Sequence, residues 1–437
     1  MTASPLAETQ PPRSFFERVG ALAGARFRWA IGAIVLVAFV LRVVARAAGG
    51  AAGFWTNSYF LFFMLAKQLA EGHGYAFPGF PPTAFRVPFY PIFLAAVTQG
   101  RQDFWAVLIA QALVSAGTVA CVAWLARLWF GRPVALVAAW ITALYPYYLW
   151  HDTALQETGF FTFLATLAMA LVVVTQRRRG LAVALLAGLV LGLAILTRAT
   201  LMPFALFAVF WLLMPDRAGA PLRRRMVTAL LCLAALGATL SPWLIRAHQI
   251  TGRYTLGTEF GAAVWGGNNP MTFRFYPRQS IDLSRRAAIL SLTRADRAQL
   301  MPLRDNEAEV SDWFLRRGLS YIYADPARFM IGAMRKNIAA FGVLPSPRHD
   351  WKTDAVQALA YGPMLVLGLI GLWRTRSRWR EFLPVYGNFL LFAGITGVLW
   401  GHSSHRAFLD VYLIIFASSV IVPTLHRIGG AAPVQRR

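Results

Sequence analysis

Long apolar stretches alternate along the chain with short connections that are rich in arginine. The stretches occupy residues 29–48, 104–130, 134–150, 159–175, 181–196, 201–214, 227–245, 356–373, 382–400 and 407–422. A helix rises about 1.5 Å per residue and needs about 20 apolar residues to cross the hydrocarbon core of a membrane. Because backbone polar groups in lipid must bond within their own segment, helices are the expected form. The pattern predicts an all-α polytopic membrane protein with about ten transmembrane helices.

The arginines indicate how the chain is oriented in the membrane. They cluster before the first stretch, in every second connection and after the last stretch: Arg13, Arg18, Arg26, Arg28, Arg127, Arg132, Arg177, Arg178, Arg179, Arg217, Arg223, Arg224, Arg225, Arg374, Arg376, Arg378, Arg380, Arg427, Arg436 and Arg437. Cytoplasmic connections carry an excess of Lys and Arg, so this distribution predicts cytoplasmic termini and an even number of spans. We therefore expect a multi-pass protein of the inner (plasma) membrane. The net charge of +24 then reflects topology rather than nucleic-acid binding.

The predicted spans divide the chain into a transmembrane core and two long external loops. The expected parts are a cytoplasmic segment (1–28), a core (29–245) that includes the first external loop (49–103), a second external loop (246–354), C-terminal transmembrane helices (355–423) and a cytoplasmic tail (424–437). The first apolar stretch follows a basic leader without a small-residue cleavage site, which predicts a retained helix. Cys121 and Cys232 lie inside predicted spans, so no disulfide is expected.

Both external loops contain segments with helical patterns. In the first loop, residues 59–70 and 90–97 are apolar but too short to span, and we expect both to lie along the membrane surface. In the second loop, one helix is predicted over 307–321. Asp325-Pro326 begins another that runs to about Phe341, with Asp at the N-cap and Pro in the first turn. Both loops are therefore expected to be ordered, which favours a functional site outside the bilayer.

Several short motifs follow one another in a specific order along the chain. They are AKQLAEGHGYAFPGFPPTAFRVPFYPIFLA (66–95), Tyr145-Pro146, Gln156-Glu157-Thr158, GLAILTR ending at Arg198, and SPWLIRAHQITGRYTLGTEFGAAVWGGNNP (241–270) with its Pro242-Trp243, Arg246 and Gly267-Asn268-Asn269-Pro270. In this order they resemble the family 39-type glycosyltransferases of the GT-C superfamily. Relatives in that superfamily include the protein O-mannosyltransferases and the lipid A aminoarabinose transferase. The resemblance covers most of the chain.

The resemblance implies a GT-C-like fold and a glycosyltransferase activity. Such an enzyme, a hexosyl- or pentosyltransferase, would move a sugar from a polyprenyl-phosphate donor to a glycan, lipid or protein acceptor on the periplasmic face. In this reaction a cation stabilises the departing phosphate, and a carboxylate deprotonates or orients the acceptor. Membrane lipid is an expected partner, and no cofactor and no nucleic acid are expected. A divalent cation stays an open alternative that the sequence does not indicate.

Three arginines are candidates for binding the donor phosphate. Arg86 stands where the family has a Lys or Arg beside a proline-rich turn, and a guanidinium engages phosphate through two parallel hydrogen bonds. Arg198 and Arg246 lie at the predicted outer ends of helices, against the positive-inside trend. The alternative for all three is contact with lipid headgroups.

The acidic residues depart from the family pattern at one position. The family carries an Asp about fourteen residues before the first Gly of its Gly-x-Gly-Tyr motif, and counting back from Gly72 leads to Ser58, with Asn57 beside it. Neither side chain is a general base near neutral pH. Glu157 matches the second acidic position of the family, and Asp152 precedes it in the same turn. We expect Glu157 to be the catalytic carboxylate, assisted by Asp152, for which helix capping is the alternative.

Further polar residues are expected to contact the substrate. They are Asn57, Ser58, Tyr75, Asn268, His405 and Arg406. The cluster of His402, His405 and Arg406 has no carboxylate or Cys at ligand spacing, so no metal site is predicted. Asp410 follows Arg406 by one helical turn and is expected to pair with it. Asn388 lies within a span and is expected to form an interhelical hydrogen bond.

Two other functions stay open. A transporter or flippase of lipid-linked sugars would also be polytopic, but such proteins tend to have two repeated halves with interrupted helices. This chain has an asymmetric layout with two ordered external loops, which favours the enzyme. Because the first-loop Asp is missing, a catalytically silent GT-C relative is the other alternative. The sequence determines neither the sugar, the acceptor nor the oligomeric state.

Overall fold

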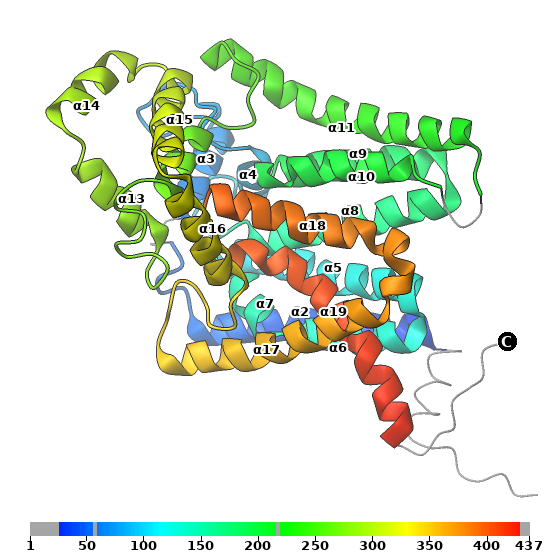
Figure 1. Cartoon of the computed structure of the whole chain (residues 1–437). Coiled ribbons are helices and arrows are strands. Elements are labelled where there is room, and N and C mark those ends of the chain that lie inside the picture. The colour runs from blue at the N-terminus through cyan, green and yellow to red at the C-terminus, as the bar shows by residue number, and fades with distance from the viewer. Residues whose placement is uncertain (1–25, 56–58, 216–218, 429–437) are drawn as a thin grey trace, which may run out of the picture.

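A computed structural model describes residues 26–55, 59–215 and 219–428. Within these ranges the regular structure is helical, with one isolated β-bridge between Ala76 and Pro82 in the first external loop. The predicted all-α class is therefore confirmed. Figure 1 shows the long helices side by side, with shorter helices of the external loops gathered at one end of the bundle. We call this end the loop end.

Seven of the described helices are long and apolar enough to cross a membrane. They are α2 (Phe27–Gly49), α5 (Phe104–Phe130), α8 (Thr158–Arg178), α11 (Leu222–Thr251), α17 (Trp351–Arg374), α18 (Trp379–Val398) and α19 (Ser403–Ile428). The segment expected to form the first external loop therefore runs between Gly49 and Phe104. The second runs from Thr251 to Trp351, a few residues shorter at each end than the sequence indicates.

The other three predicted spans are formed by shorter apolar helices. They are α6 (Arg132–Leu144) with α7 (Pro146–His151), α9 (Leu181–Ile195), and α10 (Met202–Leu212) after the 3-10 turn Ala199–Leu201. Pro146 lacks an N–H and Tyr145 before it is extended, so α6 and α7 do not form one continuous helix. Length and composition thus support seven of the roughly ten predicted spans. The short helices pack on the long ones, as α9 does on α11 (Figure 1).

Among the described residues, the two loops contain the four helices that the sequence predicts, three further α-helices and the 3-10 helix Met301–Leu303. The predicted ones are α3 (Phe60–Ala70), α4 (Phe89–Thr98), α15 (Glu307–Ala324) and α16 (Pro326–Phe341). The others are α12 (Glu259–Gly267), α13 (Ile281–Leu290) and α14 (Arg294–Leu300). Asp325 caps α16, because its side chain accepts a hydrogen bond of 2.9 Å from the backbone N–H of Arg328.

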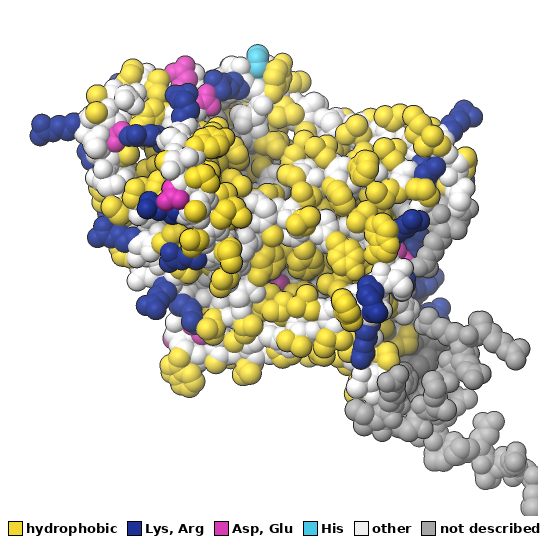
Figure 2. All heavy atoms as spheres, viewed as in Figure 1, with side chains coloured by type: hydrophobic (Ala, Val, Ile, Leu, Met, Phe, Trp, Pro, Cys, Tyr) yellow, Lys and Arg dark blue, Asp and Glu magenta, His cyan; other side chains and the backbone are white. Residues whose placement is uncertain are grey.

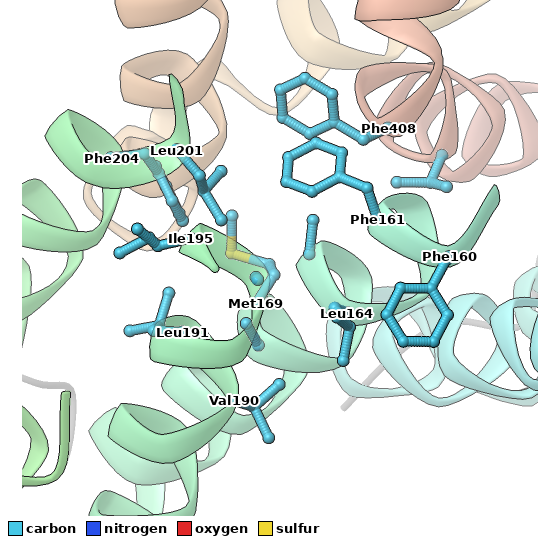
Figure 3. Packing of buried hydrophobic residues seen from close by; sticks show 14 of the residues in the cluster. Phe160, Phe161, Leu164, Met169, Val190, Leu191, Ile195, Leu201, Phe204 and Phe408 are labelled. Atoms are coloured by element: carbon cyan, nitrogen blue, oxygen red, sulfur yellow. The ribbon is translucent and has the colours of Figure 1, made fainter. Parts of the chain in front are cut away.

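Helix α8 is the most deeply buried of the long helices and lies at the centre of the apolar core. Its Phe161 packs edge-on against Phe408 of α19, with ring centroids 5.0 Å apart. Figure 3 shows these two rings together with Met169 of α8, Ile195 of α9 and Phe204 of α10. The core therefore joins the N-terminal helices to the last helix of the chain.

Two polar contacts predicted inside the spans are confirmed. Asn388 of α18 donates a hydrogen bond of 3.3 Å to the Tyr412 hydroxyl of α19. Arg406 Nη1 lies 3.6 Å from Asp410 Oδ1, one turn further along α19, and the guanidinium stacks on the ring of Tyr361 in α17. Charged side chains among apolar helices require such partners, so these contacts stabilise the packing of α17, α18 and α19.

Candidate active site

Arg86 of the first external loop forms an ion pair with Glu259, the first residue of α12 in the second loop. Arg86 Nε and Nη2 donate to the two carboxylate oxygens of Glu259 at 2.6 and 2.7 Å. The side chains are only 25% and 20% exposed. Burial lowers the pKa of Arg86, but the charge and hydrogen bonds of Glu259 raise that pKa more, so the guanidinium stays charged. Arg285 Nη1 lies 3.7 Å from the same carboxylate.

Backbone hydrogen bonds fix the first loop against the second at this ion pair. The N–H of Thr258 donates to the Ala84 carbonyl at 3.0 Å, and the N–H of Glu259 donates to the Phe85 carbonyl at 3.2 Å. Glu307 of α15 accepts hydrogen bonds from Thr258 Oγ1 and the Ala84 N–H, both at 3.0 Å, and from the hydroxyl of Thr83. The segment that carries Arg86 is therefore held by two parts of the second loop, the start of α12 and the start of α15.

Glu157 and Arg198 form a second ion pair at the same end of the bundle. Glu157 lies at the start of α8 and Arg198 follows α9, and Arg198 Nη2 donates to Glu157 Oε1 at 2.8 Å. Arg198 also donates to the His405 carbonyl at 3.4 Å, and its guanidinium stacks over Phe161. The other carboxylate oxygen, Glu157 Oε2, is buried and accepts no hydrogen bond from the described residues. This oxygen is available to accept a proton.

Tyr59 lies within electrostatic range of residues from both ion pairs. Burial and, to a smaller extent, the negative charge of Glu157 raise the pKa of Tyr59, the positive charges of Arg198 and Arg86 oppose them, and the net result is a pKa of about 12. The charge of Glu157 also helps to raise the pKa of Arg86. Because such effects fall off with distance, Arg86, Glu157, Arg198 and Glu259 belong to one cluster at the loop end.

Asp152 does not join this cluster. Its Oδ2 accepts a hydrogen bond of 3.1 Å from Nε of Arg42 and lies 3.1 Å from Arg42 Nη2, with both side chains buried. A Cβ on Gly159 would come within 2.7 Å of the Asp152 carboxylate, so α8 packs directly on it. This environment differs from the shared outer cavity that we expect from the sequence, and it favours a structural role in joining α2 to the turn before α8.

Arg246 and Tyr75 support the loop that carries Arg86. Arg246 Nη1 and Nη2 donate to the carbonyls of Thr83 and Tyr75 at 2.8 and 2.9 Å, and its guanidinium stacks on the rings of Tyr75 and Trp243. The Tyr75 hydroxyl donates to the Arg86 carbonyl at 3.0 Å. Arg246 is therefore engaged with backbone, whereas the phosphate role expected from the sequence needs free N–H groups.

Of the remaining predicted residues, His405 touches an ion pair through its backbone, Asn268 and Arg406 have other partners, and two lie outside the described residues. Asn268 bonds to the carbonyls of Val264 and Val398, and its Oδ1 accepts from Lys336 Nζ at 3.0 Å. Arg406 is engaged by Asp410 and Tyr361, as described above. The His405 ring contacts Trp400, and its backbone carbonyl meets Arg198. Asn57 and Ser58 lie outside the described residues. Three predicted residues, Arg86, Glu157 and Arg198, are brought together.

Sequence reasoning missed Glu259, Arg42 and Tyr59. Glu259 could have been identified from the sequence, because it is the one acidic residue within 241–270, the segment with the sharpest family resemblance. Arg42 could also have been identified, because it lies in the first apolar stretch, where a charge without a partner is costly. Among the described residues, no group of three His, Cys, Asp or Glu is placed to hold a metal ion.

Comparison with known sequences finds one family model that is similar to part of the chain. Residues 85–245 match the family model described as dolichyl-phosphate-mannose-protein mannosyltransferase. The match includes Arg86, Glu157 and Arg198, and it ends just before Arg246. No curated protein sequence matches the chain.

Comparison with solved structures extends the likeness to nearly the whole chain at the level of the fold. The crystal structure of the Archaeoglobus fulgidus oligosaccharyltransferase tethered with an acceptor peptide gives a TM-score of 0.56 at 13% identity, over 95% of this chain and 53% of the other. The archaeal oligosaccharyltransferase AglB from Archaeoglobus fulgidus, in complex with an inhibitory peptide and a dolichol-phosphate, gives 0.54 at 14% identity over 97% and 53%. The chain thus spans about half the length of these structures. These structures share the fold of this chain, which agrees with the all-α polytopic architecture expected from the sequence.

Proposed function

We propose that this chain, which shares the GT-C fold and carries a GT-C mannosyltransferase domain over residues 85–245, transfers a sugar from a polyprenyl-phosphate donor to an acceptor. The reaction takes place at the loop end, on the periplasmic face of an inner membrane. The proposal rests on the hydrogen bonds of the Arg86 guanidinium. Glu259 occupies one edge of its guanidinium, and the edge formed by Nη1 and Nη2 has N–H groups that bond to no described residue.

This arrangement suits a phosphate at the free edge of Arg86. A guanidinium binds phosphate through two parallel N–H···O bonds, and the Nη1–Nη2 edge supplies both. Glu259 positions the guanidinium by holding the adjacent Nε–Nη2 edge, so that little side-chain freedom is lost when the donor binds. Charge builds up on the phosphate oxygens as the sugar departs, and Arg86 stabilises this charge, with Arg198 as a second cation nearby.

Glu157 is the proposed base for the acceptor. Arg198 holds Oε1, which leaves the buried Oε2 to accept the proton of an acceptor hydroxyl or amine. The acceptor atom then bonds to the anomeric carbon while the bond from that carbon to the phosphate oxygen breaks. The polyprenyl phosphate leaves with the electron pair at Arg86. Asp152 and Arg246 contribute through the structure around the site, since their polar groups are already engaged.

A binding experiment with Arg86→Ala tests the proposal. Loss of two charge-assisted hydrogen bonds should weaken binding of a C55 polyprenyl monophosphate by roughly 10²-fold. Each such bond contributes about 1.5–3 kcal/mol, and water that enters the site of the variant replaces part of this free energy. Arg86→Lys should recover part of the affinity. Arg304→Ala, which changes an exposed arginine of the second loop, is the control. Failure of wild-type protein to bind the lipid phosphate, or equal affinity in Arg86→Ala, would contradict the proposed donor.

A further inference from the structure

Helix α16 belongs to the second external loop in sequence but packs against a membrane-spanning helix. Asn337 Nδ2 donates to the Ala393 carbonyl of α18 at 3.2 Å. A Cβ on Gly397 would come within 3.3 Å of Ala333, so the two helices cross closely there. Ala393 lies one and a half turns before the end of α18 at Val398, which is about 7 Å along the helix. α16 therefore reaches below the end of a span.

The end of α16 lies deeper still against the neighbouring span. The carbonyl of Phe341, the last residue of α16, accepts a hydrogen bond of 3.1 Å from the hydroxyl of Tyr361 in α17. Tyr361 comes ten residues after the start of α17 at Trp351, which is about 15 Å along that helix. Val343 lies against the same part of α17, because a Cβ on Gly362 would be 3.5 Å from the Val343 side chain. The chain then returns to the loop end before Trp351.

The face of α16 turned away from the bundle is apolar. Its large exposed residues are Met330, Ile331, Met334 and Ile338, which are 58, 61, 62 and 68% exposed. Their spacing places them on a single stripe of the helix. Arg328 and Arg335 lie along one border of this stripe. Figure 2 shows hydrophobic side chains over α16 and across the neighbouring α18.

The opposite face of α16 keeps its one charge inside the protein. Lys336 is buried, and its Nζ donates to Asn268 Oδ1 and to the Gly397 carbonyl, both at 3.0 Å. The ammonium group is thus shielded from the exposed stripe by the helix itself. A helix with a buried lysine and an exposed apolar stripe has the reverse of the pattern expected in water.

We infer that α16 is inserted into the lipid leaflet at the loop end, with the stripe Met330, Ile331, Met334 and Ile338 in contact with hydrocarbon chains. Lipid is the occupant because the stripe continues the apolar surface of the spans α17 and α18, at a depth below their ends. Arg328 pairs with Asp325 at 3.4 Å and the guanidinium of Arg335 stacks over Phe273, so both charges are held beside the stripe and leave its apolar surface uninterrupted. This inference is independent of the proposed transfer reaction.

Site-directed fluorescence quenching tests the insertion. A bimane probe is attached to Met334→Cys or Ile338→Cys in the full chain, after the buried Cys121 and Cys232 are replaced by Ala. In phosphatidylcholine vesicles with brominated acyl chains, both probes should lose most of their emission, while aqueous iodide should have little effect. A probe at Asp305→Cys, in an exposed turn of the second loop, should show the opposite pattern.

Two outcomes would overturn the inference. Quenching of the 334 and 338 probes by iodide, as strong as at position 305, would mean that the stripe faces water. Protection from both quenchers would mean that a protein, such as a second copy of this chain, covers the stripe, and disulfide cross-linking through Ile338→Cys would identify that copy. Size-exclusion profiles matching the wild type would show that each labelled variant is folded.

Discussion

Arg86 and Glu259 lie 173 positions apart in the chain and form two hydrogen bonds of 2.6 and 2.7 Å across the two external loops. A carboxylate bound to one edge of a guanidinium fixes the plane of that group. The backbone bonds of Thr258 and Glu259 to residues 84 and 85 keep the two partners in register. The second loop therefore determines how the first loop presents its arginine.

The first prediction concerns Glu259 as a positioning residue. Glu259→Ala should weaken binding of polyprenyl monophosphate by roughly tenfold, because the guanidinium of Arg86 regains freedom that must be lost on binding. Glu259→Gln, which keeps one carbonyl acceptor, should lose less. Titration of the lipid phosphate against each purified variant measures the effect, with the exposed Glu309→Gln of α15 as the control.

The sign of this effect separates two roles for Glu259. If the carboxylate competes with the donor phosphate for Arg86, removing it should tighten binding instead. Tighter binding in Glu259→Gln would contradict positioning, while the effect of Arg86→Ala would still test the donor site by itself.

The second prediction concerns Glu157. Loss of a general base typically costs 10²- to 10⁴-fold in rate, so Glu157→Gln should lower turnover by that order and leave donor binding nearly unchanged. Single-turnover transfer from a polyprenyl-phosphate sugar measures the rate. Robust transfer by Glu157→Gln would mean that the base lies elsewhere. Gain of transfer in Ser58→Asp, from an inactive wild type, would favour the catalytically silent relative.

Local sequence signals account for the parts of the fold that were predicted. Asp325 and Pro326 determine the start of α16 through capping and the fixed φ of proline, and both effects act within one turn. The spans follow from length and apolar composition. Three predicted spans are formed by helices shorter than expected. Local breaks such as Tyr145-Pro146 interrupt an apolar stretch without changing its composition.

The partners within the site could not be predicted in the same way. Arg86, Glu157 and Arg198 were found through the family resemblance, but Glu259 and Arg42 meet their partners only after folding. Arg42 lies 110 positions from Asp152, and no periodic pattern connects two residues at that separation. The burial that removes Asp152 from the proposed site is likewise a property of helix packing.

The third prediction concerns the buried pair of Arg42 and Asp152. Removing one partner leaves an uncompensated buried charge, so Arg42→Met or Asp152→Asn alone should destabilise the protein by roughly 3–5 kcal/mol. The double variant should recover part of this loss, because no unpaired charge stays behind. The apparent melting temperature of detergent-solubilised protein measures the change.

An exposed pair provides the matched control for that experiment. Arg304 and Asp305 form an ion pair in the second loop, with both side chains mostly exposed. Arg304→Ala should therefore leave the melting temperature nearly unchanged. Equal effects at the buried and exposed pairs, or no recovery in the double variant, would contradict a structural ion pair at Asp152.

The last prediction is a loss of stability on acidification that depends on His402. Burial lowers the pKa of His402 from about 6.5 to about 4, and its Nε2 accepts a hydrogen bond of 3.3 Å from the Ile281 N–H, so the folded protein holds the ring neutral. Between these two values the unfolded chain binds a proton that the folded chain does not, and stability should therefore fall as the pH decreases from about 6.5 to about 4. The test measures the melting temperature as a function of pH across this range. The slope of melting temperature against pH should be shallower in His402→Gln than in the wild type. His73→Gln, at an exposed position in the first loop, should keep the wild-type slope. Parallel slopes in wild type and His402→Gln would show that another group titrates, and a protonated His402 would then have to be accommodated beside the Ile281 N–H.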